Sequence, residues 1–438
     1  MDYRIGINLG WAECEDIILR YEEWFLLCKK YHITSVRIFL VEWGIGLFTE
    51  KAKMESLYRI LEIAEKYKIE VLLVLETYVH FCKNTFCDFK NNEYSWKNYS
   101  LIYKCSIDAF FSKKKIIQDY LTKVITFLKS IEMYKMLYGI ELCNEIDQIE
   151  ANKKKVKLWL KICIDAIRQN FSERYVLSYS ISDTHYYSMF KDIECVCDFH
   201  TYGFPYHTML ENIKYFDSLE NAARVTEYAR FSEESYTDLM SSKIYFAAGL
   251  WENYFRGKFY SPFSWWWEDI LSSKQYYEIL DFFCKIKDSF HTLREKKYSK
   301  MNIEIMSIIS ESKPIEKKLL LKKIKYRLGV IIKNPTFILR EIGAIRKFLK
   351  KIFKKKYSSP FSFRAYSNIS RDLYLFEAYV NVEIRITYTR NSIPVKIYIY
   401  NLVNGTVELL ADISINELIV KVFGCVLIEF IYEAKYKK

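Results

Sequence analysis

The stretch YGIELCNEID, residues 138–147, is a short apolar run that ends in polar and acidic residues. Runs of this length and composition are typical of parallel strands that are buried on both faces. Similar runs recur along the first 250 residues, with longer helical patterns between them. With 138–144 as the fourth strand, we predict the others at 4–9, 35–40, 70–76, 175–181, 194–200, 223–228 and 243–250.

The segments between these strands have the spacing of amphipathic helices. In ESLYRILEIAEKYK, residues 55–68, apolar side chains recur at intervals of three and four. The predicted helices are 16–30, 54–67, 113–131, 153–169, 207–218 and 271–289. Eight strands alternating with helices fit a closed barrel or a doubly wound sheet. Because NLGWAE after the first strand is not a Gly-rich phosphate loop, the sequence favours an α/β fold, the (β/α)8 TIM barrel.

The pattern changes after the barrel. Residues 293–357 contain two Lys-rich amphipathic stretches separated by Asn334-Pro335, which predicts two helices with a turn. From 373 onward, β-type runs alternate with turn residues such as Asn404-Gly405, as in a small antiparallel domain. We therefore predict a barrel at 1–292, a basic amphipathic helical segment at 293–357 and a small β-sandwich-like domain at 358–438.

The net charge of +12 is concentrated in the middle segment. Residues 293–357 hold 20 Lys and Arg against 5 Glu and no Asp, so the rest of the chain is mildly acidic. One interpretation is a weak contact with an anionic membrane surface or an acidic polymer. A pair of solvated helices with their lysines outward is the interpretation we favour. No nucleic-acid partner is expected, because no known nucleic-acid-binding fold or aromatic platform accompanies the charge.

The start of the chain and the cysteines bear on location. MDYRIGINLGWAE has no basic stretch followed by an apolar one, and no window reaches the ~18 apolar residues of a membrane span. We expect a cytoplasmic protein, with a membrane-peripheral location as the alternative. The 11 cysteines form no regular framework. His80, Cys82, Cys87 and Cys105 share one predicted loop, where a disulfide or a metal site stays open.

Two acidic residues end strongly apolar strands, Glu145 in YGIELCNEID and Glu227 in ARVTEYAR. In a TIM barrel the carboxyl ends of the strands and the loops that follow them form the site. Two carboxyl groups facing each other across a sugar are what cleavage of a glycosidic bond requires. Glu145 and Glu227 are therefore the candidate catalytic pair.

At these positions the sequence resembles the clan A glycoside hydrolases, in particular the family 5 cellulase-like proteins. Their Asn-Glu pair after strand four and Glu after strand seven are matched by Asn144-Glu145 and Glu227. The resemblance implies that Glu145 is the acid/base and Glu227 the nucleophile. It covers about residues 1–290, and the ordered set of matching residues is more specific than any one of them.

The same resemblance implies residues that bind the substrate or hold the nucleophile. Arg37 in SVRIF resembles the strand-two arginine that holds the nucleophile carboxylate. His200 and Tyr202 in DFHTYG resemble a strand-six pair that lines the subsite of the cleaved sugar, and Asn144 would bind the sugar 2-hydroxyl. Trp266 in FSWWWEDI resembles a sugar-stacking tryptophan.

The sequence departs from the family pattern at two points. The nucleophile is commonly followed by an aromatic residue and Gly, whereas here Tyr228-Ala229-Arg230 follows Glu227. Strand three often ends in a His, whereas VLET ends in Glu76-Thr77. Asn8 and Glu252 are weaker site candidates, and we interpret His185, His207 and Glu268 as ordinary loop residues.

These observations predict a retaining O-glycoside hydrolase of the cellulase or mannanase type. It would cleave a β-linked glycan by double displacement, with a carbohydrate as partner and neither metal nor cofactor. A catalytically inactive carbohydrate-binding barrel and a transglycosylase are the alternatives. Carboxyl groups ~5–5.5 Å apart would favour retention, and ~6.5–9.5 Å would favour inversion.

Overall fold

The structure is a computed structural model whose contacts divide the chain into two compact units. The barrel unit comprises Met1–Thr201, Leu219–Tyr228 and Lys258–Gln275, and the sheet unit comprises Tyr202–Ser218, Ala229–Gly257 and Tyr276–Lys438. The described residues are 5–11, 15–40, 51–82, 96, 100, 103–182, 186–203, 209–210, 223–230, 239–256, 263–264, 276–293, 302–309, 361–367, 371–387, 394, 396–410 and 417–431.

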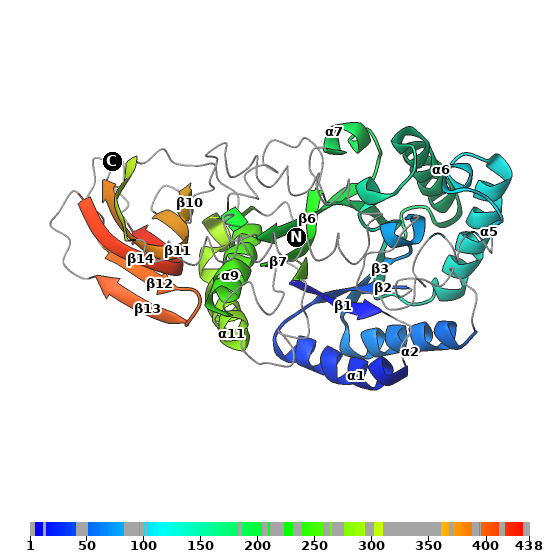
Figure 1. The fold of residues 1–438 in the computed structure, drawn as a ribbon. Coiled ribbons are helices and arrows are strands. Elements are labelled where there is room, and N and C mark those ends of the chain that lie inside the picture. The colour runs from blue at the N-terminus through cyan, green and yellow to red at the C-terminus, as the bar shows by residue number, and fades with distance from the viewer. Residues whose placement is uncertain are drawn as a thin grey trace, which may run out of the picture. The chain divides into compact units, whose positions relative to one another are not determined.

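Parallel strands close into a barrel in chain order, and β1 completes the ring by pairing with both β2 and β8. Figure 1 labels β1, β2, β3, β6 and β7 of this barrel. The strands are β1 (Gly6–Trp11), β2 (Ser35–Phe39), β3 (Glu70–Val74), β4 (Leu137–Glu141), β5 (Val176–Ile181), β6 (Val196–Gly203), β7 (Ala223–Arg230) and β8 (Phe263–Ser264). Every residue of β2 is buried, as expected of a strand covered on both faces. The TIM-like barrel predicted from the sequence is confirmed.

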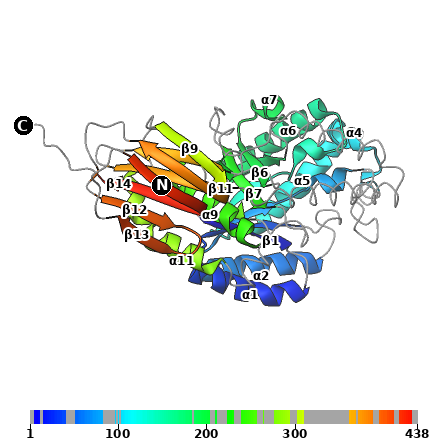
Figure 2. The ribbon, with the colours of Figure 1, turned by 60° about the vertical axis from the view of Figure 1, so that its left-hand side comes forward.

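The helices predicted at 16–30, 54–67, 113–131 and 153–169 are confirmed. Nearly all of the one predicted at 207–218 lies outside the described residues, and the one predicted at 271–289 is described from residue 276. The longer ones are α1 (Glu15–Lys30), α2 (Lys51–Tyr67), α5 (Lys114–Ile131) and α6 (Lys153–Phe171), and the short turns are η1 (Tyr78–Phe81), α4 (Ile107–Phe110), η2 (Ile146–Gln148) and α7 (Tyr187–Phe190). Helices α1 and α2 pack side by side (Figures 1 and 2). Helix α5 buries Ile117, Tyr120, Val124, Phe127, Leu128 and Ile131, a spacing that forms one apolar stripe.

Aromatic side chains hold the loop after β3 in place. Phe81 of η1 contacts Phe110, Phe111 and Trp159, with ring centroids 4.9 to 6.5 Å apart. Phe81, Phe110, Phe111 and Trp159 have no exposed surface. This packing fixes η1, which begins two residues after Glu76 at the carboxyl end of the third strand.

The sheet unit contains α9 (Leu239–Arg256), α11 (Tyr277–Ile286), η4 (Lys287–Leu293) and an antiparallel sheet. Its strands are β9 (Asn302–Ile309), β10 (Phe361–Ser367), β11 (Arg371–Thr387), β12 (Lys396–Asn401), β13 (Thr406–Leu410) and β14 (Glu417–Ile431). The order is β10-β11-β14-β12-β13, with β9 also on β11. Helix α9 packs on β11 and β14 (Figure 2). Among the described residues this is one sheet backed by a helix, not the two-sheet sandwich predicted.

The prediction of a strand at 243–250 is wrong, because these residues lie inside α9. KIYFAAGL is apolar at almost every position, and Ile244 to Leu250 include six side chains that are at most 5% exposed. A helix buried on most sides loses its amphipathic spacing and resembles a buried strand in sequence. The eighth strand is instead β8, two residues directly before the tryptophan run. Glu252 therefore lies on a helix of the sheet unit, where it hydrogen-bonds Tyr366 and pairs with Arg364.

The basic segment differs from its prediction at its start. Residues 302–309 form β9 rather than a helix, and β9 pairs with the second half of β11. The two Lys-rich stretches themselves lie outside the described residues, so their helices stay a prediction. The boundaries at 292 and 357 also stay predictions. No helix in the described part of the chain is long and apolar enough to span a membrane.

Candidate active site

Glu145 follows β4 on a backbone turn that few residues adopt. Its φ of 51° and ψ of 52° lie in the left-handed region, which costs a residue with a Cβ about 1–2 kcal/mol. The amide of Glu145 donates to Ser180 Oγ of β5 at 2.9 Å, which holds the turn. A strained non-glycine backbone at the carboxyl end of a barrel strand is characteristic of a functional site.

Arg37 on β2 is the centre of a buried hydrogen-bond network. Its guanidinium uses all five N–H donors, and its side chain has no exposed surface. Nε and Nη2 donate to the two oxygens of Glu141 at 2.7 and 2.8 Å. Nη1 donates to Asn8 Oδ1 and Glu227 Oε1 at 2.9 and 2.6 Å, and Nη2 also donates to Asn144 Oδ1 at 2.8 Å. A guanidinium bound on every side is fixed in plane and position.

His200 on β6 lies between the two candidate carboxyl groups. Its Nδ1 is 2.8 Å from Glu145 Oε1 and 3.2 Å from Glu227 Oε2. Burial lowers the pKa of His200 below its usual value, although the charge of Glu227 opposes the shift. The ring is therefore neutral near pH 7, and a proton on Nδ1 is within reach of both carboxyl groups.

An upper limit can be set on the distance between the nearest carboxyl oxygens of Glu145 and Glu227. One oxygen of each carboxyl group and one His200 nitrogen all lie within 4.8 Å of one another. The Glu145 side chain is 16% exposed, whereas that of Glu227 is 4% exposed. Two glutamates 82 positions apart in the sequence thus face each other at the carboxyl ends of β4 and β7.

The two carboxyl groups differ in their surroundings. Arg37 contacts Glu227 directly and does not hydrogen-bond Glu145. Burial, reinforced by the charges of Asp147 and Glu141 and opposed by Arg37, raises the pKa of Glu145 to about 8. Asp147 is itself fixed, because its carboxylate accepts from the amide and the hydroxyl of Ser182 at 2.9 and 3.0 Å. Near neutral pH, Glu145 is therefore a protonated acid.

Glu145, His200 and Glu227 are also close enough for one metal ion to contact all three. However, Arg37 already neutralises Glu227, and the raised pKa of Glu145 leaves that carboxyl group protonated near pH 7. A metal ligand must be deprotonated, and a neighbouring guanidinium repels a cation. The donor set therefore suits proton sharing better than metal binding.

Two residues of this network were not anticipated from the sequence. Glu141 is the last residue of β4 and has no exposed surface, and Ser180 donates to Asn144 Oδ1 at 3.2 Å in addition to its bond with Glu145. The sequence contained a signal for Glu141, because a charged residue inside an apolar strand must have a buried partner. Ser180 gave no signal, because a serine in a strand is ordinary.

The structure brings together Arg37, Asn144, Glu145, His200 and Glu227, as well as Asn8, whose Nδ2 donates to Thr226 O at 3.1 Å. Tyr202 lies in β6, but its side chain is outside the described part of the chain. Trp266, His185, His207 and Glu268 also lie outside the described residues.

The cysteines of the loop after β3 and the Glu76–His80 pair at the end of β3 are separate features. Cys82 is buried and its Sγ donates to Tyr78 O at 3.4 Å, whereas Cys87 lies outside the described residues, so the disulfide or metal site considered for this loop is not tested. His80 Nδ1 lies 2.7 Å from Glu76 Oε2, and neither side chain is exposed. The Glu76 that departs from the family pattern is thus paired with a histidine four residues later.

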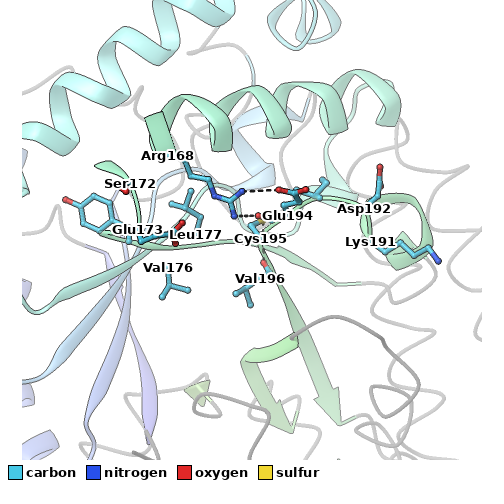
Figure 3. A pocket seen from close by; sticks show the side chains of 12 residues that line it. Arg168, Ser172, Glu173, Val176, Leu177, Lys191, Asp192, Glu194, Cys195 and Val196 are labelled. Atoms are coloured by element: carbon cyan, nitrogen blue, oxygen red, sulfur yellow. Dashed lines mark hydrogen bonds and ion pairs between the residues drawn. The ribbon is translucent and has the colours of Figure 1, made fainter. Parts of the chain in front are cut away.

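A hollow of about 540 Å³ lies at the other end of the barrel, where β5 and β6 begin (Figure 3). Arg168, Val176, Glu194 and Cys195 are among its lining residues. Arg168 pairs with Glu194 across it at 3.6 Å. The amino-terminal face of a TIM barrel is where residues serve stability rather than chemistry. The hollow is therefore separate from the carboxyl pair.

Comparison with known proteins gives a likeness in structure only. No family model matches the chain, and no curated protein matches it in sequence. The maltogenic α-amylase AmyB from Thermotoga neapolitana is 9% identical, with a TM-score of 0.52 over 98% of both chains. The endo-1,4-β-mannanase from Rhizomucor miehei is 14% identical, with a TM-score of 0.45 over 60% of this chain and 85% of that one.

The exo-β-1,4-mannosidase Op5Man5 from Opitutaceae bacterium strain TAV5 is 15% identical, with a TM-score of 0.46 over 68% of this chain and 61% of that one. The two mannan-directed proteins are too dissimilar in structure to support an argument. The likeness to AmyB extends over nearly the whole chain, but at 9% identity it concerns the fold alone. This chain has the fold of a TIM-like barrel with an antiparallel sheet after it in the sequence.

Proposed function

We propose that the chain is a retaining glycoside hydrolase that cleaves a β-linked glycan, with Glu227 as nucleophile and Glu145 as acid/base. The observation that carries the proposal is the paired geometry of the two carboxyl groups. One oxygen of Glu145 and one of Glu227 lie within 4.8 Å of each other, which is compatible with the ~5–5.5 Å separation of the carboxyl groups in retaining enzymes.

The different surroundings of the two glutamates support this assignment of roles. Arg37 donates to Oε1 of Glu227, and this charge-assisted hydrogen bond holds the nucleophile in place. The other oxygen of Glu227, Oε2, lies 3.2 Å from His200 Nδ1 and is the atom that would attack the anomeric carbon. Glu145 has a pKa of about 8 and so carries a proton to give to the leaving oxygen near neutral pH.

The reaction then follows in two balanced steps. Oε2 of Glu227 forms a bond to the anomeric carbon while the glycosidic bond breaks, and Glu145 gives its proton to the departing oxygen. In the second step the Glu145 carboxylate takes a proton from water, whose oxygen displaces Glu227 from the sugar. Both residues return to their starting states, and the sugar keeps its anomeric configuration.

Asn144 is suited to a supporting role. Its Oδ1 accepts from Arg37 and Ser180, which orients the amide. The Nδ2 group is then the part of Asn144 that would donate to a sugar hydroxyl, and such a bond to the 2-hydroxyl strengthens in the transition state. Tyr202 and Trp266 remain candidates for contacts to the sugar.

The experiment is a panel of β-linked oligosaccharides and aryl β-glycosides, assayed with the full chain and with Glu145→Ala and Glu227→Ala. Glu150→Ala is a matched control, because Glu150 is an exposed carboxyl group five residues beyond Glu145. We expect turnover by the wild type and the control, and loss of turnover by both site variants. NMR of the first-formed product should show the retained anomer.

The result also separates the alternatives. An inactive carbohydrate-binding barrel would bind members of the panel without releasing an aryl group. A transglycosylase would transfer the glycosyl unit to an added sugar acceptor in preference to water. Equal activity of the wild type and Glu227→Ala would overturn the proposal.

A further inference from the structure

The proposed reaction leaves Glu141 without a role, although it makes the most extensive contact with Arg37. We propose that Glu141 is a positioning residue for this reaction, which holds the Arg37 guanidinium in the plane that reaches Glu227 and adds a fixed negative charge beside the acid/base. The inference rests on the proposed function and deepens it.

The geometric part of the argument is the number and placement of the hydrogen bonds. Glu141 takes two of the five Arg37 donors, on the edge formed by Nε and Nη2. A carboxylate that binds two donors at once fixes the plane of a guanidinium, which a single bond does not. With that edge fixed, Nη1 is directed at Glu227 Oε1. Loss of one Glu141 oxygen would allow the plane to rotate.

The electrostatic part concerns the charge around the site. Arg37 contributes one positive charge, and Glu141 and Glu227 together contribute two negative ones. Burial raises the pKa of Glu141, but the charge and hydrogen bonds of Arg37 outweigh it and keep the pKa below its usual value. Glu141 is therefore an anion throughout the working range. A buried negative charge that no cation neutralises stabilises the positive charge that develops on the sugar in the transition state.

Several other charged or titratable groups surround these residues. His200 of β6 contributes to the surroundings of Glu141 and contacts Glu145, and Asp147 of the loop after β4 acts on Glu145. Asp198 of β6 and Arg224 of β7 form their own pair near Glu141. Because Asp198 and Arg224 neutralise each other, Asp147 and Glu141 are the negative neighbours that reinforce the effect of burial on the pKa of Glu145.

Two substitutions separate the geometric and the electrostatic effects. Glu141→Gln removes the charge and replaces one acceptor oxygen with an NH2 group, whereas Glu141→Asp keeps the charge and both oxygens but shortens the side chain. The electrostatic effect is therefore read from the pH dependence of Glu141→Gln, and the geometric effect from kcat of Glu141→Asp. For Glu141→Gln we expect the alkaline limb of the pH–rate profile to move about half a unit to one unit lower, as for one charge removed several ångströms away. For Glu141→Asp we expect the limb to stay in place while kcat falls roughly tenfold or more with KM little changed, because the transition state loses an oriented Arg37.

Asp198→Asn is the matched control, because Asp198 is another buried carboxylate with a bidentate arginine partner. It should move the alkaline limb by much less than Glu141→Gln does. An unchanged limb in Glu141→Gln, or a limb moved equally by Asp198→Asn, would overturn the electrostatic role. Wild-type kcat in Glu141→Asp would overturn the geometric one. Circular dichroism establishes that each variant is folded, and if Glu141→Gln is not, the Asp variant still decides the geometric role.

A titration that does not depend on activity keeps the two proposals distinguishable. The carboxyl carbon of Glu145, labelled with ¹³C, can be followed by NMR across pH 5–10 in the wild type and in Glu141→Gln. We expect its titration to move to lower pH in the variant even if no glycan is cleaved. Turnover with an unmoved titration would leave the function standing and overturn the inference.

Discussion

The barrel interior contains two buried arginine–carboxylate clusters that differ in one respect. Arg224 of β7 donates from Nε and Nη2 to both oxygens of Asp198 of β6, each at 2.7 Å. Arg37 binds Glu141 with the same edge at almost the same distances. The Arg224 cluster is one cation with one anion, whereas Arg37 also binds Glu227 and thus serves two anions.

Under the proposed function, this difference separates a structural pair from a catalytic cluster. Balanced buried pairs of this kind contribute little net stability, since desolvation offsets their attraction. They do fix neighbouring strands, and Asp198 and Arg224 connect β6 to β7, the strands that carry His200 and Glu227. An excess of negative charge in a buried site is unfavourable for folding alone. Its presence around Arg37 supports the proposal that this site carries out the reaction.

The largest expected effect on kcat comes from removing the Glu227 carboxyl group, the second anion that Arg37 binds. Glu227→Ala should lower kcat on an aryl β-glycoside by a factor on the order of 10⁴ or more, as for other covalent nucleophiles. Added azide should restore turnover and yield the α-glycosyl azide, because azide enters from the face that Glu227 occupied. Glu145→Ala with azide should instead yield the β-glycosyl azide. The same anomer from both variants would contradict the two roles.

The next effect comes from replacing the guanidinium. Arg37→Lys keeps the charge but loses the planar donor set, so it cannot bind Glu141, Glu227 and Asn144 at once. We expect kcat to fall roughly 10²–10³-fold, as when a preorganised electrostatic contact is removed. Arg224→Lys is the matched comparison in the other cluster and should lower kcat much less. Equal losses in the two variants would contradict the division of roles.

A smaller effect concerns pH. Glu145 must be protonated for the first step, and its pKa of about 8 is raised above the usual value, so activity should be retained below pH 8. Above pH 8, kcat/KM should fall about tenfold per pH unit. Asp147→Asn removes a charge that raises this pKa, so its alkaline limb should lie at lower pH. A limb at the same pH in Asp147→Asn would show that the charge of Asp147 does not help to hold the proton.

The smallest effect on activity is expected in the Arg224 cluster. Asp198→Asn leaves a buried arginine without its anion and should lower the free energy of unfolding by about 3–5 kcal/mol. Kcat of the folded protein should change by less than about threefold, because Asp198 contacts neither candidate carboxyl group. Replacing both residues, as Asp198→Leu with Arg224→Met, should restore much of the stability. Urea unfolding measures the free energy of unfolding, and assays in buffer measure kcat.

The sequence allowed the barrel and the catalytic candidates to be predicted for a definite reason. Parallel strands buried on both faces are apolar throughout, and an acid just after such a strand must lie at the carboxyl edge. Glu145 and Glu227 were therefore visible as candidates in the sequence. The same reasoning failed at 243–250, because α9 is buried on most sides and its apolar run has no helical spacing.

Other features required the tertiary structure. The position of Glu141 next to Arg37 depends on the register of β2, β3 and β4 around the barrel, since 104 positions separate the two residues. The left-handed turn at Glu145 and its support from Ser180 depend on how β4 and β5 are paired.

The sequence by itself determined which residues end the buried strands, because hydrophobic patterning is local. Only the tertiary structure decided which of those residues share a proton or a guanidinium, because such contacts join strands that are distant in the chain. The difference between Glu145, protonated near neutral pH, and Glu227, bound to Arg37, arises from these surroundings and not from the residue type.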